Sequence, residues 1–89
     1  MALLEGEVYE AYRSELLKRY RLLLKTLGKD LPKEKIALVR SAFDLAARAH
    51  EGTVRKSGEP YIFHPLAVAQ IAAGELGLGT TSVVCALLH

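Results

Sequence analysis

The stretch FDLAARAHEGTVRKSGEPYIFHPLAVAQIAA, residues 43–73, decides the fold, because two alanine-rich runs flank a segment rich in turn residues. Alanine has the highest helix propensity, and its small side chain lets helices pack closely. The segment between the runs, residues 52–63, contains two glycines and a proline and breaks the helical periodicity. The stretch therefore predicts a helix on each side and a surface loop between them.

The helix before the loop is predicted to begin at Pro32 and to end near residues 51–52. Proline suits a first helical turn because no backbone donor is needed there, and Asp30 or Leu31 is then the cap. One face is predicted to be buried by residues at helical spacing, namely Ile36, Val39, Phe43, Ala46 and His50.

The helix after the loop is predicted to open at Pro65, directly after His64, and to close at Gly77. Its predicted buried side consists of Leu66, Ala69, Ile71, Ala72 and Leu76. Thr80 or Thr81 then caps a further helix up to His89. The β-branched pair Val83 and Val84 leaves a strand open as an alternative for this last segment.

Residues 3–27 form the longest predicted helix, with Gly28 as its C-terminal cap. Its apolar stripe recurs at steps of three or four residues and comprises Leu4, Val8, Tyr12, Leu16, Tyr20, Leu23 and Leu27. Glu15 and Arg19, four residues apart, are predicted to pair. The sequence as a whole predicts an all-α fold, an incomplete helical bundle, with residues 1–29 as an N-terminal amphipathic helix and residues 30–89 as the beginning of a larger domain.

Composition excludes several classes of protein. Hydrophobic residues make up 51% of the 89 residues and charged residues 25%, which is typical of a globular protein and not of a disordered chain. The net charge is +2 with both signs interspersed, so bulk nucleic-acid binding is not expected. Apolar runs are too short to cross a membrane, and the acidic N-terminus is unlike a signal peptide. The single cysteine, Cys85, is predicted to be buried, and without an intrachain disulfide the protein suits the reducing cytoplasm.

The loop carries side chains that suit an anionic ligand. Arg55 and Lys56 are adjacent cations, and Ser57 and Gly58 add a hydroxyl group and a flexible backbone just before a helix N-terminus. These features favour a phosphate group. The alternative is a solvated basic turn without a ligand.

The three histidines have different settings. His64 lies at a predicted helix start, where the helix dipole opposes protonation and keeps the imidazole neutral, as a metal ligand must be. It is otherwise a capping residue. His89 is either a core histidine or a second ligand, and a spacing of 25 residues does not by itself define a metal site. We interpret His50 as a structural or supporting residue.

The quoted stretch, together with TTSVVCALLH at residues 80–89, resembles the start of the hydrolase domain of the RelA/SpoT homologue family, enzymes that make and break (p)ppGpp. The resemblance covers residues 36–89. It implies an all-helical HD-type metal phosphohydrolase, of which residues 30–89 are a truncated N-terminal portion. It further implies that His64 and His89 bind the metal, with Mn²⁺ as the usual ion, and that Arg55, Lys56 and Ser57 bind the substrate.

The resemblance also implies a function. The chain is expected to be a fragment of a guanosine 3',5'-bis(diphosphate) 3'-pyrophosphohydrolase, from a bifunctional (p)ppGpp synthetase/hydrolase of the stringent response. Family members carry an aspartate directly after the position of His89, then a Glu-Asp pair and a later aspartate. These acidic residues lie beyond the sequence, so the fragment alone is expected to be inactive.

Two alternatives stay open. One is a stand-alone small HD-type nucleotide phosphohydrolase, and the other is a helical interaction module without activity. For partners, the resemblance implies (p)ppGpp, with no direct contact to nucleic acid or membrane. Self-association of the fragment, and association of the parent protein with the ribosome, are further partner predictions.

Overall fold

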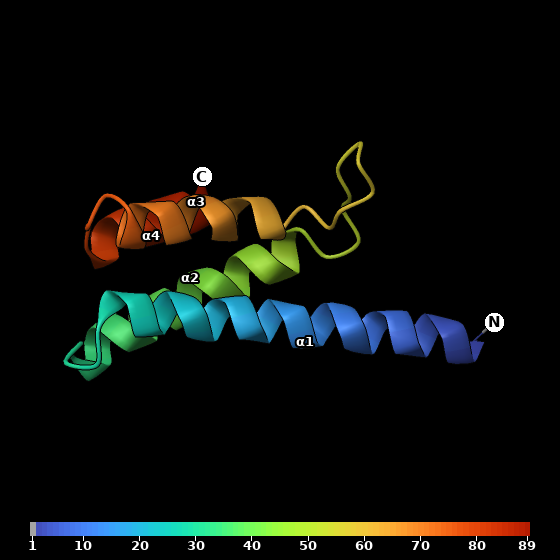
Figure 1. The fold of residues 1–89 in the computed structure, drawn as a ribbon, viewed down its shortest axis with the longest axis horizontal. Coiled ribbons are helices and arrows are strands. Elements are labelled where there is room, and N and C mark those ends of the chain that lie inside the picture. The colour runs from blue at the N-terminus through green and yellow to red at the C-terminus, as the bar shows by residue number, and fades with distance from the viewer. Residues whose placement is uncertain (1) are drawn as a thin grey trace.

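Helices account for most of the chain. The computed structural model describes residues 2–89, and their side chains from residue 6 onward, so Leu4 of the predicted stripe lies outside the described side chains. The helices are α1 (Ala2–Leu27), α2 (Lys33–Ala49), α3 (Phe63–Gly74) and α4 (Thr80–Leu88) (Figure 1). Within residues 2–89 there is no strand, and the β-structure consists of an isolated bridge between Val54 and Pro60. The predicted all-α class is confirmed, and the strand alternative for residues 80–88 is wrong.

The four helices surround one apolar core. α3 and α4 form an antiparallel hairpin, α4 also packs against α2, and α1 packs against α3 (Figure 1). α1 is longer than the others, and its N-terminal half runs past them, which makes the molecule 44 × 24 × 20 Å in extent. None of the described helices is long and apolar enough to cross a lipid bilayer.

The core draws on every helix and on the end of the loop. Its largest fully buried side chains are those of Leu23, Val39, Ile62, Val83 and Leu87. The rings of Tyr20 and Phe43 stack with centroids 4.4 Å apart and join α1 to α2. Each fully buried aliphatic side chain contributes about 1.5–3 kcal/mol relative to an exposed one, so the loop is tied to the core through Ile62.

α1 follows its prediction over most of its length. Gly28, at φ 110°, ends the helix and donates its N–H to the carbonyl oxygens of Leu24 and Lys25. The Arg19 Nε lies 2.8 Å from Glu15 Oε2, as the spacing predicts. The stripe is buried at Leu16, Tyr20 and Leu23 and half-buried at Tyr12 and Leu27. At Val8 the prediction is wrong, because α1 there extends beyond the other helices and the side chain is exposed.

The helix starts differ from the predicted ones. Pro32 is itself the N-cap of α2, α3 begins two residues before Pro65, and α4 is capped by Gly79 so that Thr80 is its first residue. None of these three caps uses a side-chain hydrogen bond. The first four N–H groups of any helix lack intrahelical partners, so proline is tolerated at several positions of a first turn. The prolines and threonines therefore mark the first turns but not the first residues.

Some predicted core positions are exposed. Ile36 lies in the first turn of α2, which is exposed throughout, and burial in that helix begins at Val39. Ile71, Leu76 and Cys85 are also exposed, although each was predicted to be buried. α3 and α4 are apolar on nearly all sides, and in such helices periodicity cannot identify the buried face.

Candidate functional site

The segment between α2 and α3 is an ordered hairpin. The Tyr61 N–H donates to the Thr53 carbonyl oxygen at 2.8 Å, and the Arg55 N–H donates to the Glu59 carbonyl oxygen at 2.9 Å. These hydrogen bonds join the two arms of a hairpin, residues 53–61, that stands out from the helices in Figure 1. The predicted surface loop is confirmed for residues 52–59, but it is wrong for Ile62 and Phe63, which are buried, and the hairpin form was not predicted.

A tight turn forms the tip of the 53–61 hairpin. The Gly58 N–H donates to the Arg55 carbonyl oxygen at 2.8 Å, and Gly58 has φ 90°. A turn that ends in a left-handed residue is the usual way to close a three-residue hairpin loop. Ser57 Oγ accepts a further bond from the Glu59 N–H at 3.4 Å. A glycine at the fourth position of the Arg-Lys-Ser-Gly turn is the sequence signal that could have revealed this geometry.

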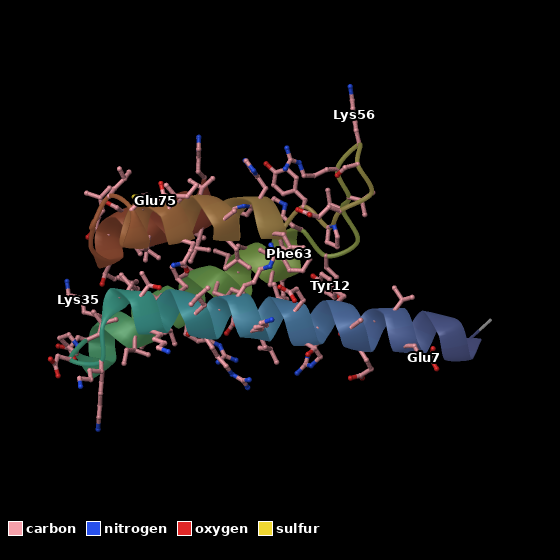
Figure 2. The ribbon with its side chains drawn as sticks, viewed as in Figure 1. Glu7, Tyr12, Lys35, Lys56, Phe63 and Glu75 are labelled. Atoms are coloured by element: carbon pink, nitrogen blue, oxygen red, sulfur yellow. The ribbon has the colours of Figure 1, made fainter. Side chains whose placement is uncertain are left out.

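The tip presents the three predicted substrate-binding residues to solvent. Arg55, Lys56 and Ser57 are all exposed. Figure 2 shows Lys56 projecting away from the helices. Two cations and a hydroxyl group on a fixed turn suit a phosphate-bearing ligand, because charged hydrogen bonds to phosphate are short and strong. The structure thus brings these three residues together on one tip, and their contact with a substrate stays a prediction.

Gly58→Ala is expected to destabilise the hairpin. An alanine at this positive φ costs about 1–2 kcal/mol, because its Cβ crowds the following carbonyl oxygen. Gly6→Ala is the matched control, since Gly6 lies within α1 without a positive φ and an added Cβ would meet nothing within 4 Å. Urea unfolding of both variants checks this: the free energy of unfolding should fall for Gly58→Ala alone, and equal values for the two variants would contradict the turn geometry.

His64 lies in the first turn of α3, and its ring is exposed. Its neighbour Phe63 is buried, and two side chains of α1 contact the Phe63 ring. The Tyr12 ring meets it edge-on at 5.8 Å, and the Arg19 guanidinium lies 4.3 Å from its centroid. Figure 2 shows Tyr12 and Phe63 facing one another across the gap between α1 and α3. The long N-terminal helix therefore fixes the turn that carries His64.

The pKa of Tyr12, which contacts this turn through Phe63, is higher than usual. Partial desolvation raises the pKa of the Tyr12 phenol, and the carboxylate of Glu51 raises it further. A phenol is already neutral at physiological pH, and this shift only strengthens that state, so Tyr12 contacts Phe63 as an uncharged ring.

His89 follows the last residue of α4 and is exposed. Because α4 runs antiparallel to α3, its C-terminal end lies toward the end of α3 where the chain enters that helix. The two predicted metal ligands, His64 and His89, thus lie toward the same end of the α3–α4 hairpin. Their coordination of one ion stays a prediction.

The donor set in this chain is partial. Among the described residues, no three His, Cys, Asp or Glu side chains lie close enough together to hold a metal ion. Structural and catalytic sites for divalent ions usually take three or more protein ligands. His64 and His89 offer such a site two imidazole nitrogen donors, which is fewer than it needs.

Sequence reasoning missed Tyr61 as a site residue. Its ring lies between those of His50 and His64, with centroid distances of 4.6 Å and 5.9 Å. His50 is the C-cap of α2, which agrees with its interpretation as a supporting residue. No periodicity marks this arrangement, because its three members belong to two helix ends and a hairpin.

An apolar groove of about 520 Å³ lies between α1 and the base of the 53–61 hairpin. Its walls are Val8, Tyr9, Tyr12, Glu51, Gly52, Thr53, Val54 and Pro60. Glu51 is the charged side chain in this set.

Comparison with known proteins relates the chain to a group of (p)ppGpp enzymes. No protein-family model matches the chain. The bifunctional (p)ppGpp synthase/hydrolase RelA of Mycobacterium tuberculosis is 50% identical over 58 residues, 65% of this chain and 8% of that protein. The bifunctional (p)ppGpp synthase/hydrolase SpoT of Escherichia coli is 51% identical over 59 residues, 66% of this chain and 8% of that protein.

A third relative extends the match. A GTP pyrophosphokinase of Myxococcus xanthus is 44% identical over 64 residues, 72% of this chain and 8% of that protein. The chain therefore spans less than a tenth of the length of these curated relatives.

Proposed function

Since the chain is a homologue of the RelA/SpoT family of (p)ppGpp synthases and hydrolases, we propose that it is the N-terminal part of an HD-type hydrolase domain that removes pyrophosphate from the 3' position of (p)ppGpp. The parent protein would be a bifunctional synthetase/hydrolase. The observation that carries this proposal is that about half of the 58 or 59 aligned residues are identical to those of two bifunctional synthase/hydrolases, RelA and SpoT.

The 53–61 hairpin has the substrate-binding role in this proposal. Arg55 and Lys56 are exposed on a turn fixed by backbone hydrogen bonds, so their backbone positions are set before a ligand arrives. Arg55 packs against the guanine base or clamps the nucleotide, while Lys56 and Ser57 hold its phosphates. Phosphoryl transfer depends mostly on such placement and on charge neutralisation.

His64 and His89 hold a divalent ion, Mn²⁺, in this proposal. Such an ion lowers the pKa of a bound water and polarises a phosphoryl oxygen. His64 is exposed at the base of the hairpin whose tip carries Arg55, Lys56 and Ser57. Carboxylates from elsewhere in the parent protein complete the set, since imidazole alone does not favour Mn²⁺ over other metals.

Arg55→Ala in the parent protein is expected to weaken (p)ppGpp binding by about 10- to 100-fold, the loss expected from one or two charge-assisted hydrogen bonds. Mn²⁺ affinity should not change, because Arg55 is no metal ligand. Arg21→Ala, at an exposed arginine of α1, is the control. Calorimetric titration with (p)ppGpp and with Mn²⁺ checks both statements. Loss of Mn²⁺ binding with unchanged nucleotide affinity would show that Arg55 has another role.

A second function is favoured by one observation. The groove between α1 and the hairpin is apolar, and Val8, Tyr9 and Val54 on its walls are exposed. These features suit a helical interaction module, with or without hydrolase activity. Light scattering of the purified chain tests this: a monomer at high concentration argues against the module, and dimers or larger species support self-association.

The remaining assignments concern the setting of the parent protein. We place it in the cytoplasm, where guanosine nucleotides are available and where a chain with one cysteine needs no oxidising compartment. Its association with the ribosome is a further part of the proposal and is testable by sedimentation. A stand-alone small hydrolase is the alternative, and an open reading frame of fewer than about 200 codons would favour it, because single domains usually have 50–250 residues.

A further inference from the structure

Three aromatic rings form a row at the junction of α2, the 53–61 hairpin and α3. His50 caps α2, Tyr61 ends the hairpin, and His64 lies in the first turn of α3. The His50 and Tyr61 centroids are 4.6 Å apart at an interplanar angle of 43°, and the Tyr61 and His64 centroids are 5.9 Å apart at 62°. Both distances are within the range of attractive aromatic contacts. We refer to His50, Tyr61 and His64 as the aromatic row.

Backbone hydrogen bonds join the same residues in the same order. The Thr53 N–H donates to the His50 carbonyl oxygen at 3.0 Å, and the Tyr61 N–H donates to the Thr53 carbonyl oxygen at 2.8 Å. The His64 N–H then donates to the Tyr61 carbonyl oxygen at 2.9 Å. The aromatic row therefore rests on a continuous series of backbone bonds, and its three Cα positions are fixed with respect to one another.

The His64 ring depends on packing for its orientation. No hydrogen bond to its ring nitrogens is formed by any side chain that the structure describes, and the ring is exposed on its outer side. Side chains that bind metals are normally held in orientation by a neighbouring group, and loss of that group weakens metal binding or activity about 10- to 100-fold. In this chain the side chain whose ring contacts the His64 ring is Tyr61.

We propose that Tyr61, supported by His50, is a positioning residue that holds the His64 imidazole in the orientation needed for metal binding. This inference rests on the proposed function, in which His64 is a metal ligand. The face and edge of the Tyr61 ring carry out the positioning. Its hydroxyl group plays no part, since the contacts are between rings.

Two variants at one position separate ring contact from simple packing. Tyr61→Phe keeps the aromatic ring, whereas Tyr61→Leu keeps an apolar side chain without a planar ring. In the parent protein, Tyr61→Leu should weaken Mn²⁺ binding about 10-fold, with a comparable fall in kcat for hydrolysis. Tyr61→Phe should match the wild type in both. Mn²⁺ affinity is measured by electron paramagnetic resonance of free Mn²⁺, which does not depend on turnover.

A variant at the other end of the row keeps the test decisive if Tyr61→Leu does not fold. His50→Leu removes the ring that supports Tyr61 and should weaken Mn²⁺ binding in the same direction by a smaller factor. Wild-type Mn²⁺ affinity in the folded Leu variants would overturn the proposal. So would equal losses in Tyr61→Phe and Tyr61→Leu, because the hydroxyl group and not the ring would then be responsible.

The same assay distinguishes the failure of this inference from failure of the proposed function. His64→Ala is measured beside the Tyr61 variants. If His64→Ala loses Mn²⁺ while Tyr61→Leu does not, the positioning role is wrong and the ligand assignment stands. If His64→Ala binds Mn²⁺ and hydrolyses (p)ppGpp normally, the proposed function itself is wrong.

Discussion

Replacing His64 with alanine in the parent protein is expected to lower the rate of (p)ppGpp hydrolysis by more than about 100-fold, beyond the usual effect of losing a group that only supports a ligand. The reason is that the variant removes one of the two nitrogen donors that this chain contributes to the proposed site. Release of pyrophosphate from radiolabelled (p)ppGpp measures the rate. If the parent protein is bifunctional, as proposed, its synthetase activity in the same preparation should persist, because His64 has no proposed part in synthesis.

The control for His64→Ala is a neighbouring substitution on the same helix. Val68 lies one turn further along α3, on the same side of the helix as His64, and is exposed, so Val68→Ala changes the helix surface beside His64 without removing an imidazole. It should hydrolyse (p)ppGpp at the wild-type rate. Equal activities of His64→Ala and Val68→Ala would remove the basis for assigning His64 as a ligand.

The largest effect on stability is expected at Leu23, whose side chain is fully buried at the centre of the core. Leu23→Ala should lower the free energy of unfolding by about 2–5 kcal/mol, through lost burial and the cavity that remains. Small domains have total stabilities of about 5–15 kcal/mol, so this variant is expected to be partly unfolded at 37 °C. Urea unfolding followed by circular dichroism measures the change.

Leu22 provides a matched control for that experiment. It is the preceding residue of α1 and is 52% exposed, so the same chemical change at this position removes little buried surface. Leu22→Ala should alter the free energy of unfolding by less than about 0.5 kcal/mol. Comparable losses of unfolding free energy at Leu22 and Leu23 would mean that α1 does not bury the face that carries Leu16, Tyr20 and Leu23.

Sequence periodicity predicted those parts of the fold in which polar and apolar faces differ clearly. α1 has charged residues opposite Leu16, Tyr20 and Leu23, and all three are buried as expected. The end of α1 at Gly28 was also predictable, because helices often end at a residue with left-handed backbone, and glycine adopts that conformation without strain. In α3 the faces differ little, and the second half of α4 is almost entirely apolar, so Ile71 and Cys85 were wrongly assigned to the core.

The candidate site was predictable only in part. Arg55, Lys56 and Ser57 are adjacent in the sequence, so their common location follows from the chain itself. The form of the hairpin depends on backbone hydrogen bonds between its two arms, such as that from the Arg55 N–H to the Glu59 carbonyl oxygen. The spacing of apolar residues does not reveal such bonds. Tyr61 was missed for the same reason, because its contacts with His50 and His64 arise only when the hairpin brings the ends of α2 and α3 together.

The central claim is that His64, in the first turn of α3, and His89, directly after α4, bind the same divalent ion. Anomalous diffraction at the manganese edge, from crystals of the parent protein grown with Mn²⁺, tests it most directly. The account predicts one anomalous peak within bonding distance of a ring nitrogen of each histidine. A peak bonded to other residues, with the two imidazoles turned away from it, would contradict the account.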